Sequence, residues 1–251
     1  PWRDGANRYA DAATVHCVLD RAATSRLVAD TSRAYGNDVQ DVLLAALALA
    51  TGQASLAVEL EGHGRDADLD LSRTVGWFTA RYPLLLRMPA SREPGGALRA
   101  VKDALRAIPD RGVGYGVLRY LHGELAHVAT PDLCFNYLGR VQAEGDGAWT
   151  LVDAGGGRAP ANRRRHRLDV NAALIDGELR VDWTWPADAI DRDAIDALAA
   201  RYVATLRLLI DHLAHAPARP TLADAPLASL DAAQFDALVA AYPALDDAYP
   251  L

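Results

Sequence analysis

The chain has 251 residues and is 51% hydrophobic, enough to bury one large core with a smaller appended segment. Its net charge of −7 argues against a nucleic-acid surface, because phosphate binding needs a basic field. Cys17 and Cys134 form neither a disulfide framework nor a CxxC metal motif. No apolar run is long enough to span a bilayer and no signal peptide opens the chain, so we expect a cytoplasmic protein with no metal and no membrane contact.

The first elements are a strand and two helices. Alternating apolar residues over 15–19 predict a strand, and Asp20 then caps a helix that runs to about residue 35. A second helix, capped by Asn37 or Asp38, runs to about residue 50. Its leucines are too dense for a surface helix, so we expect it to be buried against a sheet and to end at Gly52.

The next strand delivers a candidate functional group. Leu56, Val58 and Leu60 alternate as in a strand with one buried face, and Glu61 follows them into the turn Gly62-His63-Gly64-Arg65. A carboxylate at a strand end beside a glycine-rich turn is a candidate acid or base. The alternative is a structural salt bridge between Glu61 and Arg65.

The middle of the chain continues with strands over 75–77 and 82–86 and a helix over 97–108, which Pro109 ends. Trp77 is either a core aromatic or part of a substrate channel. The glycine run 112–116 is interpreted as a tight connection into a helix near 117–121.

The last third begins with a strand over 133–137. Strands over 168–175 and 179–185 are joined by Asp176-Gly177, a two-residue hairpin signal, and we expect this pair to form an arm. A long helix over 191–215 has one apolar stripe, and a short helix follows over 232–241.

Five blocks of the sequence, in the same order, resemble the epimerization domains of nonribosomal peptide synthetases, which belong to the condensation-domain superfamily. The matching blocks are DVLLAA at 41–46, EGHGRD at 61–66, RTVGWFTARYP at 73–83, PDRGVGYG at 109–116 and FNYLG at 135–139. Asp66 stands where the family has glutamate. The family's amino-terminal HHxxxDG motif has no counterpart, since none of the seven histidines forms a His-His pair.

The resemblance therefore implies a carboxy-terminal lobe. We expect an α/β fold, one lobe of a chloramphenicol-acetyltransferase-like two-lobed fold, with a mixed β-sheet covered by helices over residues 1–222. Residues 223–251 are interpreted as an exit helix and a linker toward a following condensation domain, because the final Tyr249-Pro250-Leu251 resembles the opening of such a domain. The partners implied are a peptidyl carrier protein, the missing amino-terminal lobe and the downstream condensation domain.

The activity that the resemblance implies is conversion of an L-residue to D, as in antibiotic biosynthesis. The Cα proton of an aminoacyl or peptidyl thioester is removed and returned on the opposite face, while the phosphopantetheine of the carrier protein holds the substrate. The chain itself binds no cofactor. The family motifs assign catalysis to Glu61. By the same resemblance Tyr137 serves the enolate oxygen or relays a proton, and Asn136 holds the thioester or the backbone geometry. The alternative for Tyr137 is a core aromatic whose hydroxyl has a partner within the chain. Substrate contacts are expected at His63, Arg65 and Trp77.

The role of one arginine run and the choice among three functions of the same superfamily stay open. The run Arg163-Arg164-Arg165 is either a solvated connection or a contact for the acidic carrier protein or its phosphate, since arginine pairs well with phosphate. The isolated lobe is expected to be inactive. A catalytically silent docking module of the same superfamily and a peptide-bond-forming condensation domain are the alternatives to an epimerase.

Overall fold

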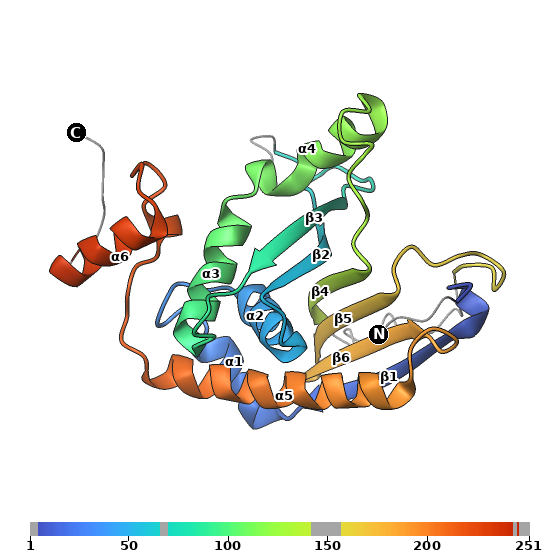
Figure 1. Cartoon of the computed structure of the whole chain (residues 1–251), viewed down its shortest axis with the longest axis horizontal. Helices are drawn as coiled ribbons and strands as arrows, with labels where there is room; N and C mark the ends of the chain where they lie inside the picture. The colour runs from blue at the N-terminus through green and yellow to red at the C-terminus, as the bar shows by residue number, and fades with distance from the viewer. Residues whose placement is uncertain (1–4, 66–69, 142–156, 243–244, 246–251) are drawn as a thin grey trace.

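Six strands form one mixed sheet in the part of the chain that this computed structural model describes, residues 5–65, 70–141, 157–242 and 245 (Figure 1). Their order across the sheet is β1-β6-β5-β4-β2-β3. The strands are β1 Ala12–Leu19, β2 Ser55–Gly62, β3 Ala80–Arg87, β4 Leu133–Val141, β5 Leu168–Ile175 and β6 Glu178–Pro186. The helices are α1 Arg21–Asp30, α2 Val39–Thr51, α3 Pro94–Arg106, α4 Val113–Gly116, α5 Arg192–His215 and α6 Ala232–Ala241.

The pairing makes the sheet mixed, as predicted. β2, β4 and β5 run parallel to one another, so their carboxyl ends meet at one edge of the sheet, whereas the other pairs are antiparallel. Asp176 and Gly177 join β5 to β6 with positive φ values of 50° and 82°, as a two-residue hairpin requires. The hairpin is not a free two-stranded arm, because β6 pairs with β1 as well as with β5 inside the sheet, and a reach toward another lobe stays a prediction.

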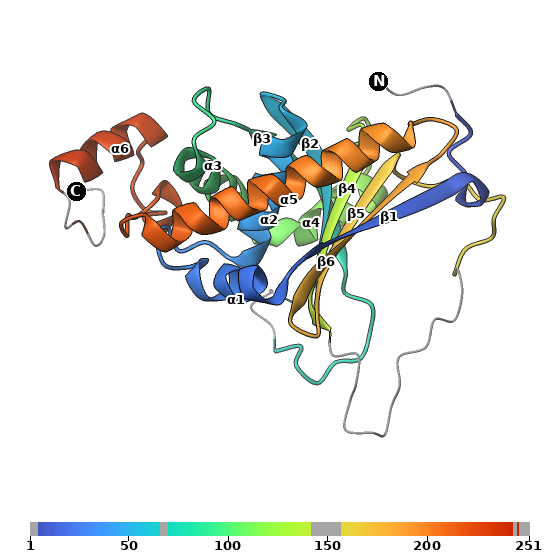
Figure 2. The ribbon, with the colours of Figure 1, turned by 90° about the horizontal axis from the view of Figure 1, so that it is seen from below.

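The helices α1, α2, α3 and α5 pack on one face of the sheet (Figure 2). α2 is central because its leucine and alanine side chains are buried almost all round, which excludes a surface position. It begins at a capping box made by Asp38 and Asp41 and ends at Gly52, whose φ of 71° is left-handed. The helix boundaries predicted around α2 are therefore confirmed.

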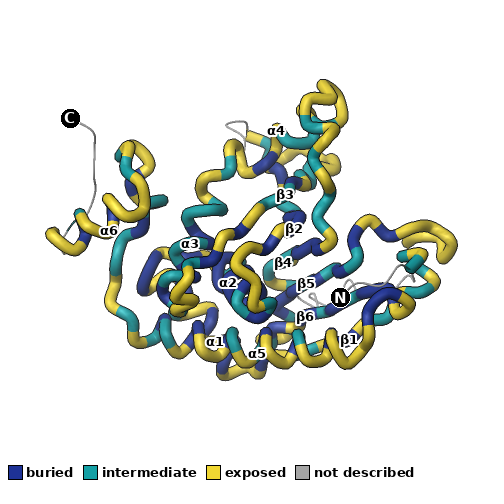
Figure 3. Tube along the Cα trace, in the orientation of Figure 1, coloured by how far each residue is buried: buried dark blue, intermediate teal, exposed yellow. Residues whose placement is uncertain are grey.

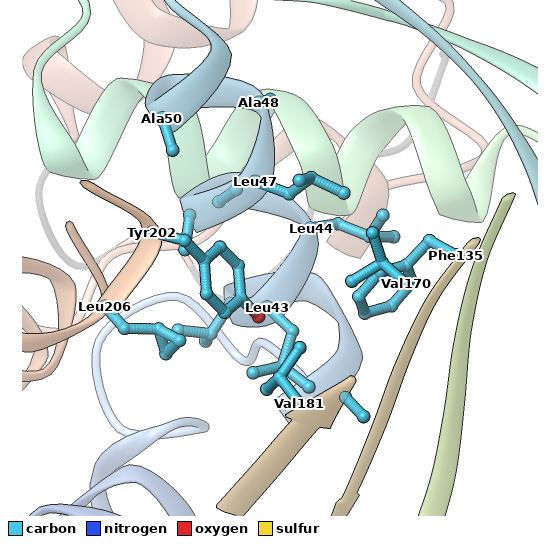
Figure 4. Packing of buried hydrophobic residues seen from close by; sticks show 14 of the residues in the cluster. Leu43, Leu44, Leu47, Ala48, Ala50, Phe135, Val170, Val181, Tyr202 and Leu206 are labelled. Atoms are coloured by element: carbon cyan, nitrogen blue, oxygen red, sulfur yellow. The ribbon is translucent and has the colours of Figure 1, made fainter. Parts of the chain in front are cut away.

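The core lies between this helical layer and the sheet. Leu44 of α2 packs near Phe135 of β4 and Val170 of β5, while Tyr202 of α5 closes the other side of α2 (Figure 4). α2 and the central strand β5 are mostly buried, whereas α6 is mostly exposed (Figure 3). The remaining face of the sheet carries polar pairs, such as Thr14–Thr184 and His16–Asp182.

Three local predictions differ from the structure. Residues 75–77 form no strand, and the side chains of Val75 and Trp77 are exposed in a loop. α1 ends at Asp30, five residues early, since residues 31–35 form turns. The glycine run is itself partly helical, because α4 begins at Val113 and continues as a π-helical turn over Val117–Leu121.

The carboxy-terminal segment is joined to the sheet-and-helix core by a buried lysine. Lys102 of α3 is 3% exposed and donates to Asp224 Oδ1 at 2.6 Å and to the Tyr35 carbonyl at 2.7 Å. Beyond it, Phe235 and Val239 of α6 form a small separate cluster with Ala225. No helix of the described residues has the length and apolarity to cross a membrane.

Truncation of the core should be costly. Phe135→Ala removes a ring that is 1% exposed, and we expect a loss of about 3–5 kcal/mol in the free energy of unfolding. Leu208→Ala, an exposed position on α5, is the matched control and should change it by less than about 0.5 kcal/mol. Urea unfolding of both variants measures this, and equal losses would contradict the core assignment.

Candidate functional site

Glu61 lies near the end of β2, between two neighbouring strands. Arg81 of β3 is its direct partner in the antiparallel register, and Arg81 Nη2 forms an ion pair with Glu61 Oε1. On the other side, Asn136 of β4 donates from Nδ2 to Glu61 Oε2 at 3.3 Å. The Glu61 side chain is only 18% exposed. Both oxygens of the predicted catalytic carboxylate are therefore held.

A cavity of about 330 Å³ opens at this end of β2. Glu61, His63 and Tyr137 all line it, together with Arg111 and residues of α2 and α3. Tyr137 follows Asn136 on β4, so the two side chains point to opposite faces of the strand. Burial raises the pKa of Tyr137, an effect that Arg140 only partly offsets, so its hydroxyl stays protonated at neutral pH and can donate a hydrogen bond.

Arg65 organises the turn after β2. Its guanidinium donates to the carbonyl oxygens of Leu71 at 2.6 Å and Thr74 at 2.9 Å, and it lies 4.3 Å from the centre of the Phe78 ring. Gly64 has a φ of 67°, and a Cβ there would overlap the carbonyl oxygen of Phe78, so the turn requires glycine. The ion pair of Glu61 is thus made by Arg81, and the salt bridge expected as an alternative, with Arg65, is wrong. Asp66 lies outside the described residues.

Trp77 is 89% exposed in the wall of a second cavity, of about 630 Å³. The apolar side chains of Val113, Val117 and Leu121 also line this cavity, together with Arg81 and Arg165. The interpretation of Trp77 as a core aromatic does not hold for this chain. The predicted substrate contacts His63 and Trp77 therefore border different cavities, of which Glu61 lines the first and Arg81 the second.

The arginine run is largely occupied by contacts within the chain. Arg164 is buried and donates to Asp169 Oδ2 at 2.6 Å. Arg165 donates to both oxygens of Glu59 at 2.9 Å, and Arg163 is exposed. The described part of the loop, from residue 157, therefore lies against the sheet at this point, and the contact with a carrier protein stays a prediction.

His166 lies between the two carboxylates that these arginines bind. Its Nε2 is 3.2 Å from Glu59 Oε1 and its Nδ1 is 3.2 Å from Asp169 Oδ1. Burial opposes ionisation of all three groups, but their contacts with one another and with Arg164 and Arg165 outweigh it, raising the pKa of His166 and lowering that of Glu59 to about 2. We call Glu59, Arg164, Arg165, His166 and Asp169 the ionic cluster.

The sulfur of Cys134 lies beside the ionic cluster. Candidate metal-ligating atoms of Cys134, His166 and Asp169 all lie within 4.8 Å of one another. Burial, with the nearby carboxylates, raises the pKa of Cys134 to about 12, so the thiol is protonated rather than the thiolate that binds metals. Asp169 is also already bound by Arg164. We therefore assign no metal to this group.

Comparison with known proteins defines the family. The model of the condensation-domain family matches residues 3–226, so the chain belongs to the condensation-domain family. It is 44% identical over 248 residues to a chondramide synthase of Chondromyces crocatus and 38% identical over 269 residues to a linear gramicidin synthase of Brevibacillus parabrevis. These alignments cover 94% and 100% of this chain but only 6% and 4% of the two synthases.

Solved structures agree with this family. The epimerization domain from the third module of tyrocidine synthetase B is 30% identical, with a TM-score of 0.76 over 84% of this chain and 51% of that one. The X-domain from teicoplanin biosynthesis, in complex with OxyB, is 19% identical with a TM-score of 0.61, which shows a shared fold. The chain thus spans about half the length of the tyrocidine domain, and the predicted fold class is confirmed.

The ionic cluster should make stability depend on pH. Because the pKa of His166 is raised in the folded state, its contribution is complete below its ordinary value of 6.5 and is lost as the pH rises through the folded-state pKa. Because the pKa of Glu59 is lowered, its contribution is present above 4.5 and is lost as the pH falls toward about 2.

We therefore expect the free energy of unfolding to fall as the pH rises above 6.5, and this dependence to be smaller in His166→Gln. The exposed His122→Gln is the matched control and should follow the wild type. Urea unfolding between pH 6 and pH 9 measures all three proteins. An unchanged pH dependence in His166→Gln would show that the imidazole does not charge within the cluster.

Proposed function

We propose that the chain is the carboxy-terminal lobe of an epimerization domain in a nonribosomal peptide synthetase. Its substrate would be an aminoacyl or peptidyl thioester on the phosphopantetheine of a peptidyl carrier protein, and its product the D-residue. The observation that carries this proposal is the position of Glu61, held by Asn136 and lining one cavity with Tyr137. The likeness to the tyrocidine epimerization domain supports it.

The chemistry assigned to Glu61 is proton transfer at Cα. As a carboxylate it accepts the Cα proton, and the electron pair of the C–H bond moves into the thioester carbonyl to give an enolate. Reprotonation of Cα on the opposite face yields the inverted residue, and the site is restored when Glu61 releases its proton and the acid on the opposite face regains one. The resemblance assigns the second proton to a histidine of the amino-terminal lobe.

The neighbouring groups have separate roles in this scheme. The amide of Asn136 orients the carboxylate, and the neutral phenol of Tyr137 donates a hydrogen bond to the enolate oxygen. His63 and Trp77 contact the substrate from the two cavities, and Arg65 shapes the turn between them. We place the complete domain in the cytoplasm, between a carrier protein and a downstream condensation domain.

Two other functions share this fold. The matching family model is that of condensation domains, so a peptide-bond-forming enzyme is the second candidate. A docking module is the third, since the X-domain neighbour is a structure solved in complex with OxyB. The EGHGR and RTVGWFT blocks, with Glu61, Asn136 and Tyr137 in place, favour the epimerase.

Exchange of the substrate Cα proton for deuterium tests the proposal. We compare the chain alone, the chain joined to an amino-terminal lobe that carries the histidine motif, and the joined form with Glu61→Gln. Exchange with loss of chirality is expected only in the second, and Glu61→Gln should slow it by about 10²–10⁴-fold. A joined form that is silent on aminoacyl and peptidyl thioesters would favour the docking module, and peptide-bond formation would favour a condensation domain.

Substitutions of Asn136 and of Tyr137 should both slow Cα exchange, for different reasons. In the joined form, Asn136→Ala frees one oxygen of Glu61, and we expect a loss in kcat of about 10²-fold. Tyr137→Phe removes the proposed donor to the enolate oxygen, and we expect a loss in kcat of about 10²–10³-fold. Steady-state exchange rates measure both, and an unchanged rate in Tyr137→Phe would contradict the role of the phenol as the donor to the enolate oxygen.

A further inference from the structure

Arg81 lies within the block RTVGWFTARYP, but it is not among the residues to which the family resemblance assigns a role. The antiparallel pairing of β2 with β3 places it directly opposite Glu61. Directly opposed residues of an antiparallel pair have their side chains on the same face, close enough to interact. The ion pair from Arg81 Nη2 to Glu61 Oε1 is the result.

The carboxylate of Glu61 is held from two sides. β2 lies between β3 and β4 in the sheet, so Arg81 approaches from one neighbour and Asn136 from the other (Figure 1). Arg81 binds Oε1 and the Asn136 amide binds Oε2. Two donors on different oxygens restrict rotation of the carboxylate more than either donor alone. Charge-assisted bonds from a guanidinium are also roughly twice as strong as neutral ones.

Arg81 and Glu61 line different cavities. Glu61 lines the cavity of about 330 Å³, and Arg81 lines the cavity of about 630 Å³ that contains Trp77. The Arg81 side chain is 40% exposed, and its guanidinium reaches Glu61 from the neighbouring strand β3. A guanidinium stays charged at all working pH values, so Arg81 cannot itself deliver or remove a proton.

We propose that Arg81 is the positioning residue for Glu61, holding one carboxylate oxygen while Asn136 holds the other. Arg65, the arginine of the EGHGR block, is committed to the carbonyl oxygens of Leu71 and Thr74 and does not take this role. The catalytic consequence rests on the proposed epimerization, but the positioning itself does not. The two parts can therefore be tested separately.

The positioning is tested by NMR on this chain without substrate. The sequence contains six glutamates, so selective ¹³C labelling of glutamate gives few signals, and loss of one in Glu61→Gln assigns Glu61. We expect restricted motion of the Glu61 side chain in the wild type, rotamer averaging in Arg81→Ala, and partial restriction in Arg81→Lys. Arg87→Ala, an exposed arginine further along β3, is the matched control and should resemble the wild type.

The catalytic part is tested in the joined two-lobe form. Arg81→Ala should lower kcat for Cα exchange by about 10–10²-fold with KM changed less than about threefold, and Arg81→Lys should recover part of the loss. Unrestricted Glu61 motion in the wild type, or unchanged motion in Arg81→Ala, overturns the positioning role. If the wild-type joined form shows no exchange, the epimerization proposal fails, and the NMR result still decides the role of Arg81.

Discussion

The pairing of β2 with β3 on one side and with β4 on the other is the constraint on which the site depends. Glu61, Arg81 and Asn136 are far apart in the sequence and meet only because the three strands are neighbours in a fixed register. A slip of one residue would turn Glu61 onto the helical face of the sheet. The buried side chains of Val58 and Leu60, which belong to the core between the sheet and the helices, prevent such a slip.

The face of the sheet that carries Glu61 is unusual in its charge. Glu59, two residues earlier on the same face, is 2% exposed and belongs to the ionic cluster. Burying such charges is costly unless each is paired, and here two arginines and His166 surround the carboxylates. The cluster ties the loop after β4 to β2, so the strand that presents Glu61 is held at a second point.

The sequence was sufficient for much of the fold. Periodicity and caps placed α2, α5, α6 and most strands, because Asp38, Gly52 and the Asp176-Gly177 turn act through local backbone chemistry. Prediction from local sequence patterns failed where contacts between distant residues determine the structure. Trp77 is a large aromatic residue of the kind that is usually buried, but its side chain is exposed in a loop. No local pattern in the sequence indicated that β1 would pair with β6.

Some residues of the candidate site could be predicted from the sequence and others could not. Glu61, Asn136 and Tyr137 were predictable because they lie in motifs of a recognisable family. Arg81 was not, since the loop between β2 and β3 is long and its length does not reveal the register. The charged run at residues 163–165 resembled a solvated segment, because no local pattern predicts that Glu59 and Asp169 lie beneath it.

The most direct test of the proposed role of Glu61 is a crystal structure of the complete two-lobed domain with an aminoacyl-pantetheine amide in place of the labile thioester. We predict that a carboxylate oxygen of Glu61 lies about 3–3.5 Å from the substrate Cα, the separation needed for proton transfer. We also predict that Arg81 and Asn136 still hold Glu61. A substrate Cα bound elsewhere, with Glu61 facing only protein atoms, would contradict both the catalytic role of Glu61 and the epimerase proposal.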